Sequence, residues 1–480
     1  MSVRLPIKID ATSNGEFRPV PLPLELRTAR RIAADRLIAN ADRAGARRRA
    51  FLRGLCGAAT TLLAYQEVFA ATGRVGGSFI LPKESAFEPA AAAESLTGKD
   101  FIFDVQTHMV DVNGGWRQRR AGKRWEGALA SFPQGHCGEA DPVACFSADR
   151  FVKEVFVDSD TQVAVLSFVP GLPDDNPLNV EEALRVRSLV ERLKGTGRLL
   201  LHAPVVPNAP GEVERMATTA RTYAVAAWKV YTQFGPERVG WRLDDPRIGV
   251  PFIEKARGLG IKNIAIHKGL PFPGLPLEFA TCDDVGPAAR QFPDVNFIIY
   301  HSGFETDRRE LAYDAAHAER GIDNLVKSLA ENGIGPSGNV YAELGSTWRF
   351  LMRDPTSAAH ALGKLVRHVG ENNLLWGTDS IWYGSPQDQI QAFRAFEISD
   401  ALVQQHGYQA LTPSLKAKIF GLNGAKLYGV DPAAVMQRTD ADPIGRFKRA
   451  ALSHPSFATY GPRSDGEYEA FLAAHGGVPL

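Results

Sequence analysis

The chain has 480 residues, of which 44% are hydrophobic, so it is long enough to bury one large core together with additional segments. Its formal net charge is only +1, which argues against a nucleic-acid partner. The four cysteines are too few for a disulfide scaffold, and none of them forms a CxxC pair, which argues against a structural zinc knuckle. No apolar run reaches the roughly 18–20 residues of a membrane-spanning helix, so we predict no membrane partner.

The first 74 residues form a basic extension with two interpretations. Residues 1–53 contain 12 Lys and Arg against 5 Asp and Glu. The stretch Arg48–Arg53 resembles a twin-arginine export signal, with residues 55–64 as its apolar part and cleavage near residues 69–71. The alternative is a basic amphipathic helix on the surface of an uncleaved protein. The first interpretation places the protein in the periplasm, and the second leaves it in the cytoplasm.

After a lead-in over residues 75–100, eight apolar runs recur within residues 101–434. Most are spaced by roughly 30–40 residues, which is what a strand, a helix and two loops require. The repeat predicts a (β/α)8 TIM barrel of the α/β class, with a long insertion after the first strand and a C-terminal extension over residues 435–480. The predicted strands are residues 101–108, 163–169, 198–206, 226–232, 263–267, 296–301, 339–345 and 374–379.

Polar residues suited to metal binding or proton transfer stand at the ends of these runs. Gln106 and His108 are two apart on one strand, so their side chains face the same way. His267 and Asp379 end two other strands, and imidazole and carboxylate are good ligands for zinc or manganese. His301 is expected to be a fourth ligand or a proton shuttle. The pattern therefore predicts a metal site at the C-terminal mouth of the barrel.

The order and spacing of these residues resemble the amidohydrolase superfamily. The closest resemblance is to its amidohydrolase-related branch, which includes aminocarboxymuconate semialdehyde decarboxylase and resorcylate decarboxylases, and it covers about residues 101–430. In that branch the first strand ends in DxHxH or DxExH. The corresponding positions here are Asp104–His108 for the first strand, His267 and His301 for the two later histidines, Gly377–Asp379 for the GTD motif and Asn423–Leu427 for the closing helix.

The resemblance implies one divalent metal, zinc or alternatively manganese, held by His108, His267 and Asp379. Gln106 departs from the family pattern, and a neutral amide is a poorer ligand than imidazole or carboxylate. Lys229 stands where binuclear members carry a carbamylated bridging lysine, although a substrate-binding or snorkelling lysine is the simpler interpretation. The family analogy also suggests a homodimer.

Two reactions would use the same residues. In the leading interpretation, metal-activated water attacks a carbonyl-type carbon of a small molecule, and Asp379 or His301 accepts its proton. The alternative is metal-dependent, non-oxidative decarboxylation of an aromatic or dienoic acid. A second alternative is a metal-poor barrel that binds a ligand without catalysis. The residues expected to contact the substrate are Lys229, Arg242, His202, Glu343 and the basic stretch Arg117–Arg124. Because several of these side chains are basic, we expect an acidic substrate.

Cys137 and Cys145 lie in the predicted insertion and have two expected states. In the cytoplasm they would be free thiols. After export they could form a disulfide, because the periplasm is an oxidising compartment. Their state therefore bears on the same question as the N-terminal signal.

Overall fold

The computed structural model describes residues 5–9, 18–19, 22–131, 137–192, 197–449 and 465–474. Much of the predicted C-terminal extension, residues 450–464 and 475–480, lies outside this range. The remainder of that extension contains three helices. They are α18 (Pro432–Ala441), α19 (Pro443–Arg449) and α20 (Asp465–Ala474).

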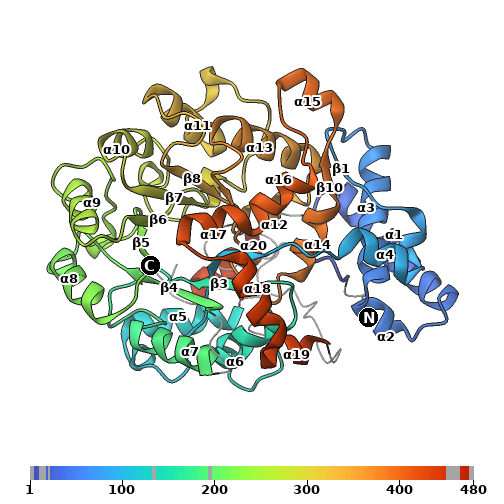
Figure 1. Ribbon diagram of the computed structural model, residues 1–480, viewed down its shortest axis with the longest axis horizontal. Coiled ribbons are helices and arrows are strands. Elements are labelled where there is room, and N and C mark those ends of the chain that lie inside the picture. The colour runs from blue at the N-terminus through green and yellow to red at the C-terminus, as the bar shows by residue number, and fades with distance from the viewer. Residues whose placement is uncertain are drawn as a thin grey trace.

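Eight parallel strands form one sheet in chain order, as the sequence predicts (Figure 1). Each strand overlaps one of the predicted apolar runs, and helices follow the strands on the outside, which is the architecture of a TIM barrel. The strands are β2 (Phe103–Thr107), β3 (Val163–Leu166), β4 (Leu199–Pro204), β5 (Ala227–Tyr231), β6 (Asn263–His267), β7 (Asn296–Tyr300), β8 (Val340–Glu343) and β9 (Leu374–Leu375).

Backbone hydrogen bonds join β2 to the segment directly after β9 and close the barrel. Val105 N donates to Trp376 O at 3.0 Å, and Asp379 N donates to Gln106 O at 2.9 Å. Thr107 and Ser380 form a parallel bridge further along. This closing seam places the end of β2 directly beside the segment that follows β9, which is where Asp379 lies.

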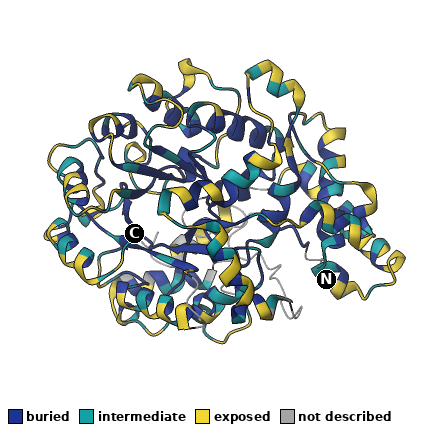
Figure 2. Cartoon of the chain, in the orientation of Figure 1, coloured by how far each residue is buried: buried dark blue, intermediate teal, exposed yellow. Residues whose placement is uncertain are grey.

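The helices around the barrel are amphipathic, and their apolar faces pack on the strands. In α7 (Val180–Arg192) the buried residues are Val180, Ala183, Val186 and Val190, which recur every three or four positions. Burying each valine contributes roughly 1.5–3 kcal/mol. Figure 2 shows the buried strands inside and the exposed outer faces of the helices. The other main covering helices are α8 (Glu212–Thr222), α9 (Gly249–Gly258), α10 (Val285–Gln291), α11 (Gly321–Glu331), α13 (Pro355–His368), α14 (Gln387–Ala395) and α17 (Asn423–Tyr428).

The N-terminal extension forms a helical layer against one side of the barrel (Figure 1). It consists of α1 (Leu24–Arg43), α2 (Arg48–Arg53) and α3 (Leu55–Ala71), with α4 (Pro89–Leu96) in the predicted lead-in. Most of α3 is buried, including every residue from Cys56 to Leu62. The apolar part of the suggested export signal is therefore a packed helix, whereas the basic helix α1 lies on the surface and buries one face, formed by Leu26, Ala29, Ala33, Leu37 and Ala41. Among the described residues, no helix is both long and apolar enough to cross a membrane.

A small two-stranded sheet fastens this layer to the barrel. β1 (Gly77–Phe79) pairs antiparallel with β10 (Phe396–Ile398), which directly follows α14. The ring of Phe79 packs edge-on against Phe396 with centroids 5.7 Å apart. The predicted lead-in is thus an ordered part of the fold and includes both a strand and a helix.

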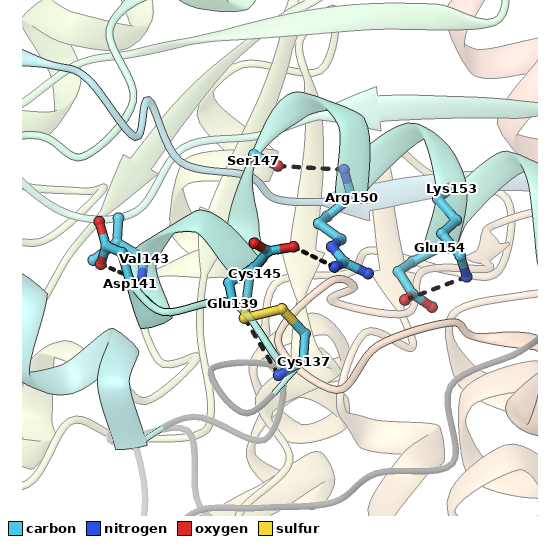
Figure 3. The surroundings of a disulfide bond; sticks show 9 residues. All are labelled: Cys137, Glu139, Asp141, Val143, Cys145, Ser147, Arg150, Lys153 and Glu154. Atoms are coloured by element: carbon cyan, nitrogen blue, oxygen red, sulfur yellow. Dashed lines mark hydrogen bonds and ion pairs between the residues drawn. A yellow bond between two sulfur atoms is a disulfide. The ribbon is translucent and has the colours of Figure 1, made fainter.

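The insertion between β2 and β3 is built from short helical segments and one disulfide. Cys137 and Cys145 are bonded to each other, which is the second of the two expected states (Figure 3). Cys145 belongs to the short helix η4 (Pro142–Phe146), and Val110 N donates to Phe146 O at 2.9 Å. The insertion is thereby bonded to the chain just beyond the end of β2. Its other segments are η2 (Gly115–Gln118), α5 (Arg120–Ser131), α6 (Ala148–Phe151) and η5 (Val152–Val157).

Gly377 allows the chain to leave β9 past the neighbouring strand. A Cβ atom at this position would lie 1.6 Å from Glu343 Oε1 and 3.2 Å from Gln106 Cβ. The Glu343 carboxylate cannot easily withdraw, because it is buried and accepts hydrogen bonds from the backbone N–H groups of His301 and Gly345. The glycine of the GTD motif is therefore a steric requirement of the closed barrel.

We predict that Gly377→Ala lowers the free energy of unfolding by about 1–3 kcal/mol or more, because it overpacks a filled interior. Urea unfolding followed by circular dichroism measures this change. Gly258→Ala is the matched control, since no atom lies within 4 Å of its Cβ position at the end of α9. Equal stability of the two variants would contradict the steric interpretation.

Candidate functional site

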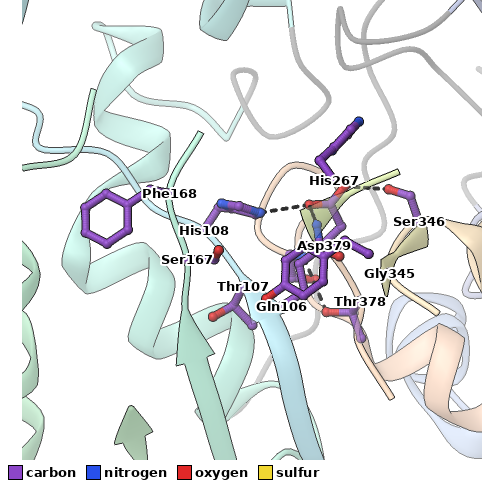
Figure 4. A network of polar contacts seen from close by, with 12 residues as sticks. Gln106, Thr107, His108, Ser167, Phe168, His267, Gly345, Ser346, Thr378 and Asp379 are labelled. Carbon is purple, nitrogen blue, oxygen red and sulfur yellow. Dashed lines mark hydrogen bonds and ion pairs between the residues drawn. The ribbon is translucent and has the colours of Figure 1, made fainter. Parts of the chain in front are cut away.

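The structure brings most of the predicted site residues to the C-terminal ends of the strands. Figure 4 shows Gln106, His108, His267 and Asp379 there, together with Ser346. Each of the predicted residues at the strand ends is buried, with at most 2% of its surface exposed. They come from β2, β4, β5 and β6 and from the segments at the ends of β7, β8 and β9. The buried members are Gln106, His108, His202, Lys229, His267, His301, Glu343 and Asp379.

The Asp379 carboxylate is stabilised by contacts with three side chains of the site. Its Oδ1 lies 3.0 Å from His108 Nε2 and accepts a hydrogen bond of 3.0 Å from Gln106 Nε2. Its Oδ2 accepts a hydrogen bond of 2.6 Å from Ser346 Oγ. Burial alone would raise the pKa of Asp379, but the contacts with His108 and Ser346 outweigh it and hold that pKa below its usual value. Asp379 is therefore a carboxylate at neutral pH.

His267 and His301 form a second pair. His301 Nδ1 lies 2.6 Å from Gly345 O, which can only accept, so this nitrogen carries the ring proton. His301 Nε2 is then an acceptor and faces His267 Nδ1 at 3.2 Å, while His267 Nε2 faces Leu270 O at 3.2 Å. A neutral His267 has one proton for these two acceptors. Only one of these two contacts can therefore be a hydrogen bond while His267 is neutral.

Burial keeps both of these histidines neutral. It lowers the pKa of His301 to about 4, against the opposing effect of Asp379. It also lowers the pKa of His267 well below its usual value, and the nearby charges of His301 and Lys229 act in the same direction. The effect of His301 on His267 acts only when His301 is protonated. Neither ring is an imidazolium at pH 7, so each is available as a base or as a neutral hydrogen-bonding group.

Aromatic rings line the site. Tyr231 and Phe272 stack on His267 with centroid distances of 4.9 Å and 4.7 Å, and Trp382 stacks on His108 at 5.2 Å. The Lys229 ammonium lies 3.8 Å from the centroid of Tyr300 and 4.3 Å from that of Tyr231. Cation–π contacts of this kind stabilise a buried ammonium group by roughly 2 kcal/mol when it is desolvated.

Glu343 and His202 form a supporting layer. The Glu343 carboxyl accepts backbone hydrogen bonds from His301 at 3.1 Å and from Gly345, and burial raises its pKa well above the usual value. His202 Nε2 lies 3.0 Å from Tyr428 Oη, and burial lowers the pKa of this histidine well below its usual value. Both side chains have protein partners, so the structure presents them as groups that orient their neighbours.

Three residues of the site lie in the left-handed backbone region, with φ of 61° at Asp379, 66° at His301 and 52° at Ser346. His301 directly follows β7, and Ser346 and Asp379 lie three and four residues beyond the ends of β8 and β9, where the chain turns out of the barrel. Such conformations cost of order 1–3 kcal/mol at non-glycine residues and concentrate at functional sites. The strain is what aims these side chains across the mouth.

The basic residues predicted to hold an acidic substrate do not join the buried group. Arg242 is partly exposed and forms bonds of 2.9 Å and 3.0 Å with Asp244. Arg117, in the insertion, pairs with Glu126 and Asp141. Among the predicted basic residues named individually, only Lys229 lies in the site.

A separate cavity of about 520 Å³ lies beside the site, next to the ends of β3 and β4. Trp116, Asn176, Arg215 and Tyr223 are among its lining residues, and Arg119 of the predicted basic stretch lines it as well, whereas none of the buried site residues does. The polar side chains of Asn176 and Arg215 are bonded to neighbouring protein groups.

The main site residues that the sequence analysis missed are Ser346, Tyr231 and Phe272. Ser346 could have been found, because it immediately follows the last predicted residue of its strand. The stacking partners carry no such signal, since an aromatic residue at a strand end is as often part of the core. Trp382, which the sequence could place only in the core or a pocket wall, is the wall beside His108.

The metal expectation can be tested against this geometry. His108 Nε2 and Asp379 Oδ1 have the separation of two ligands on one ion, but His267 directs its nitrogens to His301 and Leu270. Within the described ranges, no three or more His, Cys, Asp or Glu side chains are grouped so that they could hold a metal ion. Gln106, as placed, presents an amide N–H to Asp379, and an N–H group is not a ligand. The residues as they lie therefore do not form the three-ligand site.

Because His301 is buried and neutral, we predict that the free energy of unfolding depends on pH. Between its folded pKa of about 4 and its ordinary 6.5, the unfolded chain binds a proton here and the folded chain does not, so lowering the pH favours unfolding. His301→Gln removes this proton-binding site. From pH 7 to pH 5, the unfolding free energy of the wild type should fall by about 2 kcal/mol relative to this variant.

Urea unfolding at both pH values provides the measurement. His317→Gln is the control, because His317 is exposed and its pKa is raised by Asp314 instead of lowered. A difference between wild type and His301→Gln that does not vary with pH would contradict the neutral, buried state of His301.

Comparison with known proteins gives one family and several distant structures. No curated protein matches the chain. Similar solved structures include an uncharacterised TIM-barrel protein from Bordetella bronchiseptica (10% identity, TM-score 0.42, covering 70% of this chain and 100% of that one). A second is a putative 2-pyrone-4,6-dicarboxylic acid hydrolase from Pseudomonas putida (17% identity, TM-score 0.40, covering 68% of this chain and 97% of that one). A third is a 5-carboxyvanillate decarboxylase from Novosphingobium aromaticivorans, complexed with manganese and a nitrobenzoic acid (14% identity, TM-score 0.43, covering 70% of this chain and 99% of that one).

The sequence model of the amidohydrolase family matches residues 179–430, just over half of the chain. The matched range runs from the start of α7 to just beyond α17 and contains Lys229, His267, His301 and Asp379. It begins after β2, so Gln106 and His108 lie outside it. The chain belongs to the amidohydrolase family.

Proposed function

We propose that this amidohydrolase-family chain is a carboxy-lyase that removes CO2 from a planar, carboxylated small molecule without oxidation. The observation that carries the proposal is the burial of the whole polar group, each member of which is at most 2% exposed. Hydrolysis, the leading interpretation of the sequence, uses the same residues, and family membership alone does not separate the two reactions.

A buried site favours decarboxylation on physical grounds. The substrate begins as a carboxylate with a localised charge and ends as neutral CO2, so removing water raises the energy of the starting state more than that of the transition state. Hydrolysis, in contrast, requires a water molecule at the reacting carbon. The aromatic surroundings of His108 and His267 supply the low-polarity environment that the first reaction needs.

Lys229 and the aromatic rings support the substrate class. A buried ammonium among Tyr231 and Tyr300 can bind a carboxylate by a charge-assisted hydrogen bond. The flat faces of Trp382 and Phe272 suit a planar ring or diene.

The proposed reaction needs one proton and no oxidant. The bond between the substrate carbon and its carboxylate breaks, CO2 leaves, and the bonding electron pair stays on the carbon. That carbon takes a proton from the His108–Asp379 pair, whose partners are 3.0 Å apart. Solvent then restores the proton to the pair after CO2 has left. His301, kept neutral by burial, orients the substrate opposite Asp379 by hydrogen bonding.

The proposal predicts CO2 release from hydroxylated aromatic or dienoic carboxylic acids, measured as bicarbonate in a coupled assay. Asp379→Asn should lower kcat about 10²–10⁴-fold, the range for loss of general acid–base catalysis. Lys229→Met should chiefly raise KM, about 10–100-fold, because a hydrogen bond between charged groups contributes roughly 1.5–3 kcal/mol.

Asp294→Asn is the control for both variants, since Asp294 is exposed and pairs with Arg257 and Lys262 far from the strand ends that carry the site. The matched test offers esters and lactones of the same acids. Turnover of these compounds without any CO2 from the acids would overturn the lyase proposal in favour of hydrolysis.

A second prediction concerns divalent metals. Asp379 contributes a negative charge beside His108, whereas His267 and His301 lie near the Lys229 ammonium, which disfavours a cation there. Binding of Mn²⁺ or Zn²⁺, measured by titration calorimetry, should therefore weaken at least about ten-fold in His108→Ala and Asp379→Asn, and much less in His267→Ala. Equal weakening in all three variants would mean that His267 leaves His301 to complete a three-ligand site.

A further inference from the structure

A short N-terminal segment, Leu5–Ile9, is buried against the loop that follows Asp379. Leu5, Ile7 and Ile9 belong to the core, and Lys8 is 4% exposed. The backbone N–H of Lys8 donates to Asp388 Oδ2 at 2.9 Å, although the two residues are 380 positions apart in the sequence. The first described residues of the chain are therefore in contact with its last third.

The Lys8 side chain is fully engaged by this loop. Its Nζ donates to Tyr383 O at 3.0 Å and to Ser385 O at 2.6 Å, and it lies 3.4 Å from Asp388 Oδ1. Two hydrogen bonds and one ion pair thus hold the ammonium group. Such a buried ion pair adds little net stability compared with an apolar replacement, but its geometry is specific.

The same loop carries two side chains of the site. Trp382 stacks on His108 with an interplanar angle of 19°. Tyr383 Oη lies 3.2 Å from Ser346 Oγ, and the Ser346 hydroxyl donates to Asp379 Oδ2 at 2.6 Å. Lys8 holds the carbonyl of Tyr383 while the hydroxyl of that residue reaches the partner of the buried carboxylate.

We propose that Lys8 is a positioning residue for the site: by fixing the loop over residues 380–386, it holds Trp382 against His108 and the Tyr383 hydroxyl against Ser346. The N-terminal segment is then part of the working enzyme. The kinetic consequence rests on the proposed carboxy-lyase function, whereas the effect on the loop does not.

Hydrogen–deuterium exchange on the full chain tests the loop directly. In Lys8→Met, peptides covering residues 380–386 should exchange at least about ten-fold faster, while those of β6 (Asn263–His267) keep the wild-type rate. Lys262→Met is the matched control, since it removes an exposed ion pair with Asp294 by the same substitution. Wild-type exchange in the loop of Lys8→Met would overturn the proposal, as would a uniform increase across all strands.

Trp382 supplies a second readout that does not depend on activity. Acrylamide should quench more tryptophan fluorescence in Lys8→Met than in wild type, and the added Trp382→Phe substitution should abolish that excess. If Lys8→Met does not fold, Asp388→Asn removes the charge but keeps an acceptor, and the same loop-specific exchange is expected at a smaller size. An excess that persists without Trp382 would contradict the proposal.

The kinetic test separates this inference from the function. With an acid that the wild type decarboxylates, Lys8→Met should lower kcat about ten-fold with little change in KM, and Lys8→Arg should restore part of it. Loss of loop protection with no wild-type turnover of any acid would leave the positioning role supported and the lyase proposal rejected. Unchanged kcat in a loosened loop would reject the catalytic part of the positioning role.

Discussion

The organisation of this barrel follows from keeping one carboxylate charged in a dry interior. Asp379 is 2% exposed, and an ionised group in such a place is stable only if hydrogen bonds replace its lost water. Gln106, His108 and Ser346 supply those bonds. Two of these partners come from β2 and the third from the segment after β8, so the compensation exists only when the barrel is closed. The ionised state of Asp379 thus depends on closure of the barrel.

The eight strands were predictable because each must bury both faces and therefore appears in the sequence as a short, apolar run ending in a polar residue. The convergence of His108, His267, His301 and Asp379 was predictable for a related reason, since parallel strands end at one mouth. Lys229 lies with the buried polar residues at the strand ends, whereas Arg242 does not, because a loop residue has no strand to fix its direction. Its guanidinium is bonded to Asp244 instead.

What the sequence could not provide is the direction in which each ring faces. His267 occupies the position of a metal ligand in the resembled family, but its orientation depends on stacking with Tyr231 and Phe272 and on the carbonyl of Leu270. Those contacts come from segments that no strand pattern connects. The result is two donor pairs, His108 with Asp379 and His267 with His301, where residue types alone indicated one set of three. Donor identity is encoded locally, and donor arrangement is a property of the whole fold.

The contact between Lys8 and Asp388 also bears on how the protein is made. A ribosome releases Lys8 long before Asp388 exists, so the N-terminal segment must wait through most of synthesis with its apolar residues unpaired. The same holds for the closing seam between β2 and the segment after β9. Contacts of such large sequence separation form late, since the intervening chain must be ordered first. The nascent chain is therefore a candidate for chaperone protection until its final third emerges, and the site is completed as one of the last steps.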